Sequence, residues 1–343
     1  MKTSLSRIAA SIIIGVALVA AAALVAGFFG RTVPFFDSLA QFRAHLTVAL
    51  FVLALLLIVM RSVAAATVAT IVAAYAAVSV SPFLMPRPAG EPHRVAPAKT
   101  ALVGRGPLKL LQMNLRFNAD PVPAVTTIAR LDPDVLTLQE INRRWVEAIE
   151  PLRSGYPYAA FCGVGEAVGG VAILSRVPFV QADAACRVDD GFVSRRLDLG
   201  NGQELTVVSE HLAWPWPFRQ GRQVAALGEE VLPKLQMPLL IAGDFNAAPW
   251  SATVQRYAGA SRTTPATGIG PTWLPSALPA PLRRLVGLPL DNVLASDGVR
   301  LVSVATEPAT ASDHLPILVT FDVPSASSGG ASPARFVGRA AAR

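Results

Sequence analysis

Several polar side chains lie directly beside short apolar runs, a pattern that the packing of strands does not explain. They are Asn114, Glu140, His211, Asp244, Asn246, Asp291, Asp313 and His314. Taken alone, a polar residue at a strand end is most often a cap or turn residue, because solvation there costs little. Together they supply carboxylates, carboxamides and two imidazoles, and hard oxygen ligands of this kind suit Mg²⁺ or Mn²⁺ rather than zinc.

Short apolar strands mixed with helices must position these side chains. We expect strands near residues 108–115, 134–139, 171–174, 239–242, 292–295 and 317–321. We expect helices at residues 121–131, with Asp120 as the N-cap, and at residues 220–232. Gly200-Asn201-Gly202 joins two further apolar runs and is a hairpin signal. Many strands, interspersed helices and a hairpin predict a mixed-sheet α/β domain rather than a doubly wound one.

The first quarter of the chain has the composition of a membrane segment. The chain of 343 residues is 52% hydrophobic and only 15% charged, and most of the bias lies in residues 1–85. We predict three transmembrane helices there, at about residues 8–30, 44–60 and 63–85, with the last two in a tight hairpin that turns at Arg61. The first run is too long for a signal-peptide core.

Three spans would place the N-terminus and the rest of the chain on opposite sides of the bilayer. Lys2 and Arg7 precede the first span and Arg31 alone directly follows it, which favours the N-terminus inside, whereas a count over all flanks favours the reverse. The first helix often dominates this choice. We therefore expect a multi-pass protein of the cell (inner) membrane whose remaining domain is extracytoplasmic.

The remaining chain divides by composition. Residues 86–107 are rich in Pro, Ala and basic residues and predict an extended linker, and residues 324–343 predict a disordered tail. The working domain is then residues 108–323. It holds 18 basic and 21 acidic residues, a formal charge of −3, although the whole chain carries +7. A nucleic-acid partner stays open but is not favoured, because its binding domain would carry the positive charge itself.

The two cysteines, Cys162 and Cys186, allow at most one disulfide, and their spacing fits no zinc pattern. We expect two unpaired residues packed in the core, with a disulfide as the open alternative.

Taken together, these motifs resemble those of the endonuclease/exonuclease/phosphatase superfamily. The resemblance covers about residues 108–321, with its motifs in the family's order: Asp132-Pro133-Asp134-Val135-Leu136, Gln139-Glu140, residues 170–176, His211-Leu212, Gly243-Asp244-Phe245-Asn246 and Ser312-Asp313-His314. It implies a four-layer α/β sandwich with two mixed β-sheets, preceded here by the three-helix transmembrane segment. It also implies a metal-dependent hydrolase acting on phosphoester bonds, with its site where the loops of the two sheets converge.

The resemblance implies a role for each polar residue. Glu140 would hold Mg²⁺ or Mn²⁺, with Asn114 and Asp313 beside the ion. Asp244 would orient or deprotonate the attacking water, and Asn246 would hold that water or a phosphoryl oxygen.

The histidines match two further family positions. Asp291 would pair with His314 and fix its tautomer, so that His314 donates a hydrogen bond to the phosphate, while His211 would be a general acid. Two residues depart from the family pattern, Glu210 and Asn292, and both are expected near the site, where they could alter the choice of substrate.

Other residues could contact the substrate. Phosphate contacts could come from Arg176, Arg195, Arg196 and Arg222, although surface salt bridges are the usual role of such arginines. The aromatic segment at residues 214–218 alternates Trp and Pro, so it cannot form a helix. Either its rings fold back over the edge of the domain, or Trp214 and Trp216 form a wall facing the substrate, a wedge at the bilayer interface or a stacking platform for a base.

These observations leave the substrate open. Anchoring favours a phosphoester of a lipid or another non-nucleic substrate, and the alternative is an endonuclease or exonuclease acting on DNA or RNA. A catalytically inactive binding module is the remote alternative, and the presence of Glu140, Asp244 and His314 argues against it.

Overall fold

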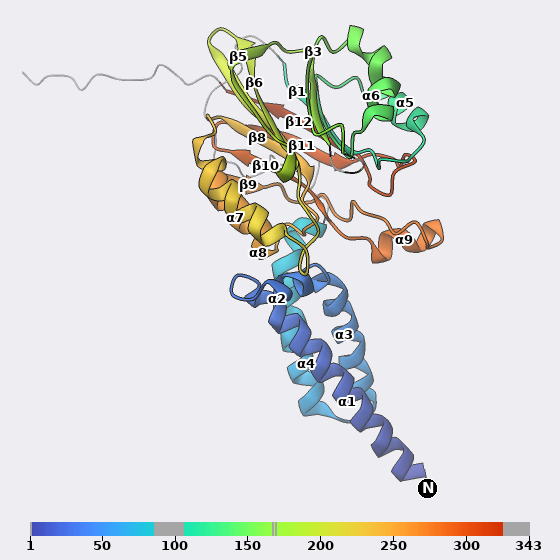
Figure 1. The fold of residues 1–343 in the computed structure, drawn as a ribbon. Coiled ribbons are helices and arrows are strands. Elements are labelled where there is room, and N and C mark those ends of the chain that lie inside the picture. The colour runs from blue at the N-terminus through green and yellow to red at the C-terminus, as the bar shows by residue number, and fades with distance from the viewer. Residues whose placement is uncertain (1, 86–105, 167, 169, 325–343) are drawn as a thin grey trace, which may run out of the picture.

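The computed structural model describes residues 2–85, 106–166, 168 and 170–324. A bundle of helices formed by the N-terminal segment stands beneath a domain built on two sheets (Figure 1). Nearly all of the expected linker (residues 86–107) and of the expected tail (residues 324–343) lies outside the described residues.

The N-terminal bundle contains α1 (Lys2–Ala26), a 3-10 turn η1 (Gly27–Phe29), α2 (Pro34–Ala40), α3 (Arg43–Val59) and α4 (Val63–Leu84). Two segments of the described chain, Ile8–Phe29 and Val63–Leu84, are long and apolar enough to cross a membrane. The helices α2 and α3 meet at 66° and would supply a third span if the bent pair is one span. The expectation of three spans therefore becomes two or three. Arg61 adopts φ 61° in the predicted turn between α3 and α4.

Each sheet has six strands. The first has the order β11 (Arg300–Thr306), β12 (Ile317–Asp322), β1 (Leu108–Asn114), β2 (Val135–Gln139), β4 (Val171–Ser175) and β3 (Tyr158–Cys162). The second has the order β5 (Phe179–Arg187), β6 (Phe192–Gly200), β7 (Gln203–His211), β8 (Leu239–Asp244), β10 (Asp291–Ser296) and β9 (Thr263–Pro265). The pairs β1–β2 and β7–β8 are parallel and the others are antiparallel, so both sheets are mixed, as predicted.

The two sheets pack face to face and helices cover their outer faces. Buried side chains of both sheets, such as Leu110 and Val207, form the central core. The helices α5 (Pro121–Leu131) and α6 (Arg143–Ile149) pack on the first sheet, and α7 (Gln220–Glu230) and α8 (Ala252–Ser261) on the second (Figure 1). The domain is therefore the four-layer α/β sandwich that the resemblance implies.

The expectation of two unpaired cysteines was wrong. Cys162 on β3 and Cys186 on β5 form a disulfide with their Cα atoms 5.6 Å apart. Both strands are edge strands, one in each sheet, and they lie at the same end of the sandwich. The pairing depends on how the two sheets stack, and a separation of 24 residues in the sequence does not reveal that.

Candidate active site

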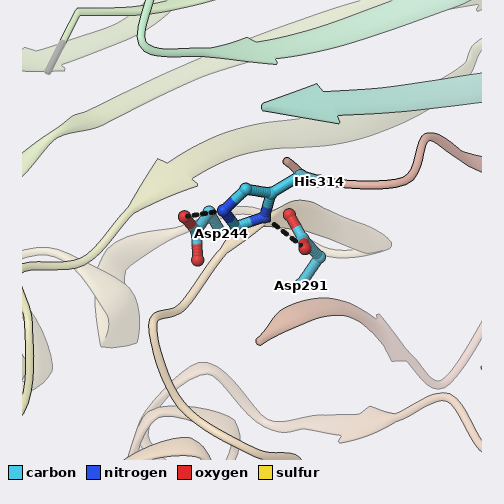
Figure 2. A group of neighbouring side chains, drawn as sticks. All are labelled: Asp244, Asp291 and His314. Carbon is cyan, nitrogen blue, oxygen red and sulfur yellow. Dashed lines mark hydrogen bonds and ion pairs between the residues drawn. The ribbon is translucent and has the colours of Figure 1, made fainter. Parts of the chain in front are cut away.

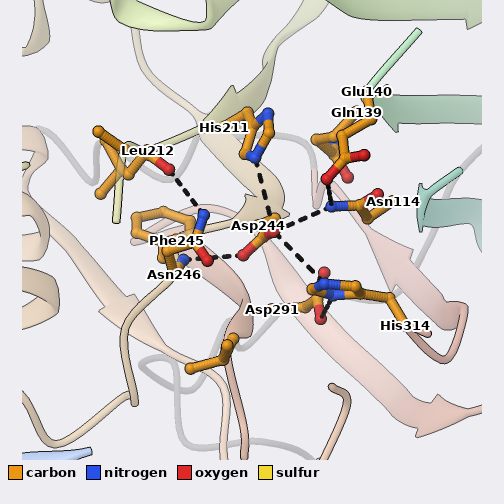
Figure 3. Close-up of polar contacts among 12 residues, drawn as sticks. Asn114, Gln139, Glu140, His211, Leu212, Asp244, Phe245, Asn246, Asp291 and His314 are labelled. Atoms are coloured by element: carbon orange, nitrogen blue, oxygen red, sulfur yellow. Dashed lines mark hydrogen bonds and ion pairs between the residues drawn. The ribbon is translucent and has the colours of Figure 1, made fainter. Parts of the chain in front are cut away.

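The expected site residues meet where strand ends of the two sheets converge (Figure 3). Asn114 ends β1, beside the end of β2, and Glu140 directly follows β2. His211 and Asp244 end the parallel strands β7 and β8 and face each other in register. The carboxyl ends of two parallel strands lie at the same end of their sheet. Two of these side chains therefore come from one end of the first sheet, and the other two come from the adjacent end of the second sheet.

Asp244 lies at the centre of the group and is buried. Its Oδ2 accepts a hydrogen bond from Asn114 Nδ2 (2.9 Å) and lies 3.7 Å from Nε2 of both His211 and His314. Its Oδ1 accepts a hydrogen bond from the backbone N–H of Asn246 (2.8 Å). Burial raises the pKa of Asp244 above its usual value, although the nearby histidines partly oppose this.

His314 and Asp291 form a buried pair (Figure 2). Nδ1 of His314 lies 2.8 Å from Oδ2 of Asp291, which fixes the orientation of the imidazole. Burial acts to lower the pKa of His314, but the carboxylates of Asp291 and Asp244 outweigh it and raise this pKa to about 10. At neutral pH the imidazole therefore carries a proton on Nε2, which it can donate toward Asp244 or a bound anion.

Glu140 has an unusual backbone conformation at the edge of the site. Its φ of 55° lies in the left-handed region, which a residue with a long side chain seldom adopts. The backbone N–H of Phe117 donates to Oε2 (3.0 Å), and Asn114 Nδ2 donates to Oε1 (3.1 Å). Local strain of this kind is costly and occurs often at functional sites.

Two neighbouring groups of side chains could hold a cation. One ligand atom each from Asp244, Asp291 and His314 lie within 4.8 Å of one another. In this group, Nδ1 of His314 and Oδ2 of Asp291 already bind each other. The carboxylates of Glu140 and Asp244, on either side of Asn114 Nδ2, offer hard oxygen ligands to a divalent cation as well.

Gly243 allows the close approach of strands on which this geometry depends. A Cβ atom at this position would lie 2.0 Å from the backbone oxygen of Glu210 on β7. Only glycine fits here, and the next residue, Asp244, is thereby held beside His211. Asn246 follows in the left-handed conformation (φ 45°), and its Nδ2 donates to the carbonyl of Leu212 (2.8 Å).

A sequence model of the Endonuclease/Exonuclease/phosphatase family matches residues 111–314, which span all of these motifs. The chain belongs to this family. Its enzymes typically hydrolyse phosphoester bonds, and the resemblance drawn from the motifs is thereby confirmed.

Named relatives and solved structures agree with the assignment. A UPF0294 protein of Vibrio cholerae is 29% identical over 236 residues, which cover 63% of this chain and 78% of the relative. An endonuclease/exonuclease/phosphatase from Bacteroides vulgatus matches with a TM-score of 0.53 and 14% identity, over 64% of this chain and 100% of that structure. TDP2 of D. rerio, complexed with a single-strand DNA product, matches with a TM-score of 0.51 and 19% identity, with the same coverage. At these identities the two structures show a shared fold alone.

Two of the expected arginines lie away from the family's site. Arg176 follows β4 at the end opposite Glu140, where it pairs with Asp132 and stacks on Tyr156 (5.0 Å). Arg196 lies midway along β6 and forms an ion pair with Glu204.

The other two arginines do not line the cleft beside the site either. Arg195 donates to the carbonyl of Ser194 and lies over the ring of Phe179, and Arg222 is exposed on α7. Asp313 is next to His314 in the chain, but its carboxylate faces Arg116 at 3.9 Å.

A cleft of about 320 Å³ opens beside the site. Its walls include Glu140, His211, Asn246 and Trp214, so one of the two expected aromatic residues faces the cleft. Arg219 also lines it, with its guanidinium near Asp190 (4.0 Å), and sequence reasoning missed this cation. Its position directly after the aromatic segment was the available signal.

A buried chain of polar groups behind the site was not predicted from the sequence. Gln112 Nε2 donates to Asp291 Oδ1 and to Gln139 Oε1, both at 2.8 Å. Gln139 Nε2 donates in turn to Ser209 Oγ on the other sheet (2.9 Å). The signal was an amide in the middle of an apolar strand, because a buried amide needs partners.

The two departures from the family pattern have structural partners. Glu210 is buried against α8, where it accepts a hydrogen bond from the hydroxyl of Tyr257 (2.5 Å), and burial raises its pKa well above the usual range. Asn292 Nδ2 donates to the carbonyl of Ala247 (2.8 Å). Neither lines the cleft described above: the side chain of Glu210 binds a side chain of α8, and that of Asn292 binds the backbone of the loop after β8.

Proposed function

We propose that this protein is a membrane-anchored, divalent-metal-dependent phosphoesterase whose substrate is a phosphoester of a lipid. The observation that carries the catalytic part is the convergence of Asn114, Asp244, His211 and His314 on one point, with Glu140 at its edge. Hydrolysis of a phosphoester requires a positioned water, neutralised phosphoryl oxygens and a proton for the leaving oxygen. This group of side chains can meet each requirement.

The carboxylates of Glu140 and Asp244 have different roles. Glu140 and Asn114 would hold Mg²⁺ or Mn²⁺, with Asp313 as a further candidate, and the ion would supply neutralisation of the phosphoryl oxygens. Asp244 is held by Asn114 and by the N–H of Asn246, so it can orient a water and accept its proton as the oxygen attacks phosphorus.

The two imidazoles flank Asp244, each at 3.7 Å from Oδ2. His314, fixed by Asp291, donates its Nε2 proton in a hydrogen bond to a phosphoryl oxygen as negative charge develops there. His211 lines the cleft and donates a proton to the leaving oxygen as its bond to phosphorus breaks. Asn246 also lines the cleft and would lie beside that leaving group, with its Nδ2 held by the carbonyl of Leu212.

The surface around the cleft supports a lipid substrate. Trp214, Trp216 and Phe218 are each more than half exposed, although they are large and apolar. The ring of Trp216 contacts that of Phe35 on α2, with centroids 5.1 Å apart, so this aromatic loop reaches the N-terminal bundle. Exposed tryptophans beside apolar helices are typical of the interface between membrane and water.

A second apolar element lies at a similar level. This is the short helix α9 (Ala280–Val286), which Figure 1 shows projecting from the side of the catalytic domain. Its Leu282 and Leu285 are exposed. The backbone of Leu285 and Val286 faces the imidazole of His45 in α3, so α9 sits beside the N-terminal bundle. An active site framed by two such elements is suited to a headgroup that stays in the bilayer.

We predict that replacing both tryptophans separates two activities. The variant Trp214→Ala/Trp216→Ala should lose most hydrolysis of phospholipid in vesicles but keep hydrolysis of a soluble chromogenic phosphodiester, because the catalytic groups do not depend on these rings. Leu235→Ala, remote from the aromatic loop, is the matched control and should change neither activity. If the variant hydrolyses both substrates as fast as the wild-type protein does, the two tryptophans have no role at the bilayer. If the variant does not fold, the rings are structural.

The proposed location of the catalytic domain is extracytoplasmic. A disulfide between Cys162 and Cys186 forms and persists in oxidising compartments and is rare in the cytosol. We predict that a reporter fused after Met85 gives an extracytoplasmic signal in cells. In the full-length protein, both cysteines should resist an alkylating reagent until a reductant converts the disulfide to thiols. A cytoplasmic reporter signal together with free thiols would reverse this assignment.

Activity profiling of the full-length protein in detergent with Mg²⁺ tests the substrate class. Sphingomyelin, other phospholipids, inositol phosphates and supercoiled DNA should be compared in parallel. A nuclease is the second candidate, because Trp214 in the wall of the cleft could stack on a base. Hydrolysis of nucleic acid alone would favour that candidate, and hydrolysis of none of these substrates would contradict the proposed function.

A further inference from the structure

The segment of the chain that resembles a membrane anchor also contacts the loop that carries a site residue. This β8–α8 loop, residues 245–251, begins directly after Asp244 and includes Asn246. The backbone N–H of Asn246 donates to Asp244, so the position of the loop decides how this carboxylate is oriented. All residues from Phe245 to Trp250 are buried, although they belong to a loop.

The helix α2 provides much of the cover and several of the hydrogen bonds. Gln41, directly after α2, accepts a hydrogen bond from the backbone N–H of Ala248 (2.5 Å). Trp250 Nε1 donates to the carbonyl of Ala40 (2.7 Å), and its ring packs against Phe83 of α4. Two helices of the bundle therefore hold the middle of the loop.

Asp37 of α2 holds the far end of the loop. Its two carboxylate oxygens accept hydrogen bonds from the first backbone N–H groups of α8, those of Ala252 (2.7 Å) and Thr253 (3.0 Å). A carboxylate is favoured at this position because these groups have no partner within the helix and carry partial positive charge. Asp37 is only 5% exposed, so its loss would leave buried donors unpaired.

A second path links Asp37 to the site through side chains. The hydroxyl of Thr253 lies 2.7 Å from Asp37 Oδ2 and 3.1 Å from Gln220 Oε1, and it can donate to either. Gln220 Nε2 in turn reaches the carbonyls of Asn246 (3.2 Å) and Ala213 (2.7 Å). Asp37 is thus connected to the β8–α8 loop and to Ala213, which directly precedes the aromatic segment at residues 214–218.

We propose that α2 is a positioning element of the active site, and that Asp37 is its principal residue. Asp37 does not touch substrate. It fixes the β8–α8 loop so that the N–H of Asn246 keeps Asp244 oriented for the reaction. The membrane segment is then required for turnover as well as for anchoring, including turnover of a substrate that never contacts a membrane. This inference rests on the proposed function.

The test uses the full-length protein in detergent and bis-p-nitrophenyl phosphate, a soluble phosphodiester. Asp37→Ala should lower kcat by about 10- to 100-fold with KM little changed, because a small displacement of a positioned group costs this much. Asp37→Asn, which keeps one acceptor oxygen, should retain more activity. Hydrogen exchange of the peptide that covers residues 245–253 should become faster, and it should be fastest in the variant that loses most kcat.

Gly30→Ala provides a second route to the same displacement. A Cβ atom at Gly30 would lie 2.6 Å from Asp37 Oδ1 and 2.8 Å from its Cα, so the added methyl group must push α2. Asp120→Ala is the matched control, because Asp120 caps α5 on the other sheet through the N–H of Val122. It should lower the melting temperature by the amount that loss of one exposed helix cap costs and leave kcat unchanged.

The outcomes separate the two ideas. Unchanged kcat and unchanged exchange in both Asp37→Ala and Gly30→Ala overturn the positioning role, as does a loss of kcat that the Asp120→Ala control matches. If Asp37→Ala does not fold, Gly30→Ala and Asp37→Asn decide the question. If the wild-type protein hydrolyses no phosphoester, the proposed function fails, and the exchange of residues 245–253 alone reports whether α2 holds the loop.

Discussion

Removal of divalent cations is expected to abolish hydrolysis by the full-length protein, and Mg²⁺ or Mn²⁺ is expected to restore it. The carboxylates of Glu140 and Asp244, which both accept a hydrogen bond from Asn114 Nδ2, offer oxygen ligands at the point where the proposed reaction would need phosphate charge to be neutralised. Arg219 is the cation that lines the cleft, and its guanidinium already contacts the carbonyl of Asp189. The measurement is the rate of hydrolysis of a soluble phosphodiester before chelation, after exhaustive chelation, and after each metal is added back.

Glu140→Gln should raise the Mg²⁺ concentration needed for half-maximal activity by at least about 10-fold, since removal of groups that support a metal site costs this much affinity. Glu147→Gln is the control. Glu147 is exposed on α6, the helix that follows Glu140 in the chain, and this variant should behave as wild type. Full activity in excess chelator would contradict the metal requirement, and an unchanged Mg²⁺ dependence in Glu140→Gln would place the ion elsewhere.

Local sequence signals predicted the central elements of the fold well. The helix α5 has the expected bounds, and Asp120 caps it through Val122, because the capping pattern is contained in a few adjacent residues. The strands β1, β2, β8 and β12 lie within two residues of the expected positions, because they are buried runs of apolar residues. The edge strand β11 was missed, since its half-exposed sequence has no continuous apolar run.

The site was predictable as a set of residue types but not as a network. The position of each polar residue beside an apolar run is a local feature, and the family motifs add to it. By contrast, the contacts of Gln112 with Asp291 and of Asp37 with Thr253 join residues 179 and 216 positions apart. The stacking of two sheets and the docking of α2 create these contacts, so no local pattern could have revealed them. The pairing of Cys162 with Cys186 was missed for the same reason.

Substitution of the central acid and of the buried imidazole should lower turnover strongly. We expect Asp244→Ala and His314→Ala each to reduce kcat by about 10²–10⁴-fold, the scale for a positioned acid or base. Asp244 lies within 4 Å of both imidazoles, so its loss also changes their electrostatic environment. Far-UV circular dichroism and melting temperature should accompany the kinetics, because removing one member of a buried charged pair also costs stability.

A double substitution then decides how Asp291 acts. Its Oδ2 binds His314 Nδ1 and its Oδ1 accepts from Gln112, so it touches no open space and can contribute only through the imidazole, by orienting it and by favouring its protonated form. Asp291→Asn and His314→Ala combined should therefore be little worse than the poorer single variant, since residues that act as one unit have losses that do not multiply. Gln112→Leu, which removes the support behind Asp291, should give a smaller loss in the same direction. If the losses of Asp291→Asn and His314→Ala multiply, Asp291 has a role of its own, and the buried pair is not a single functional unit.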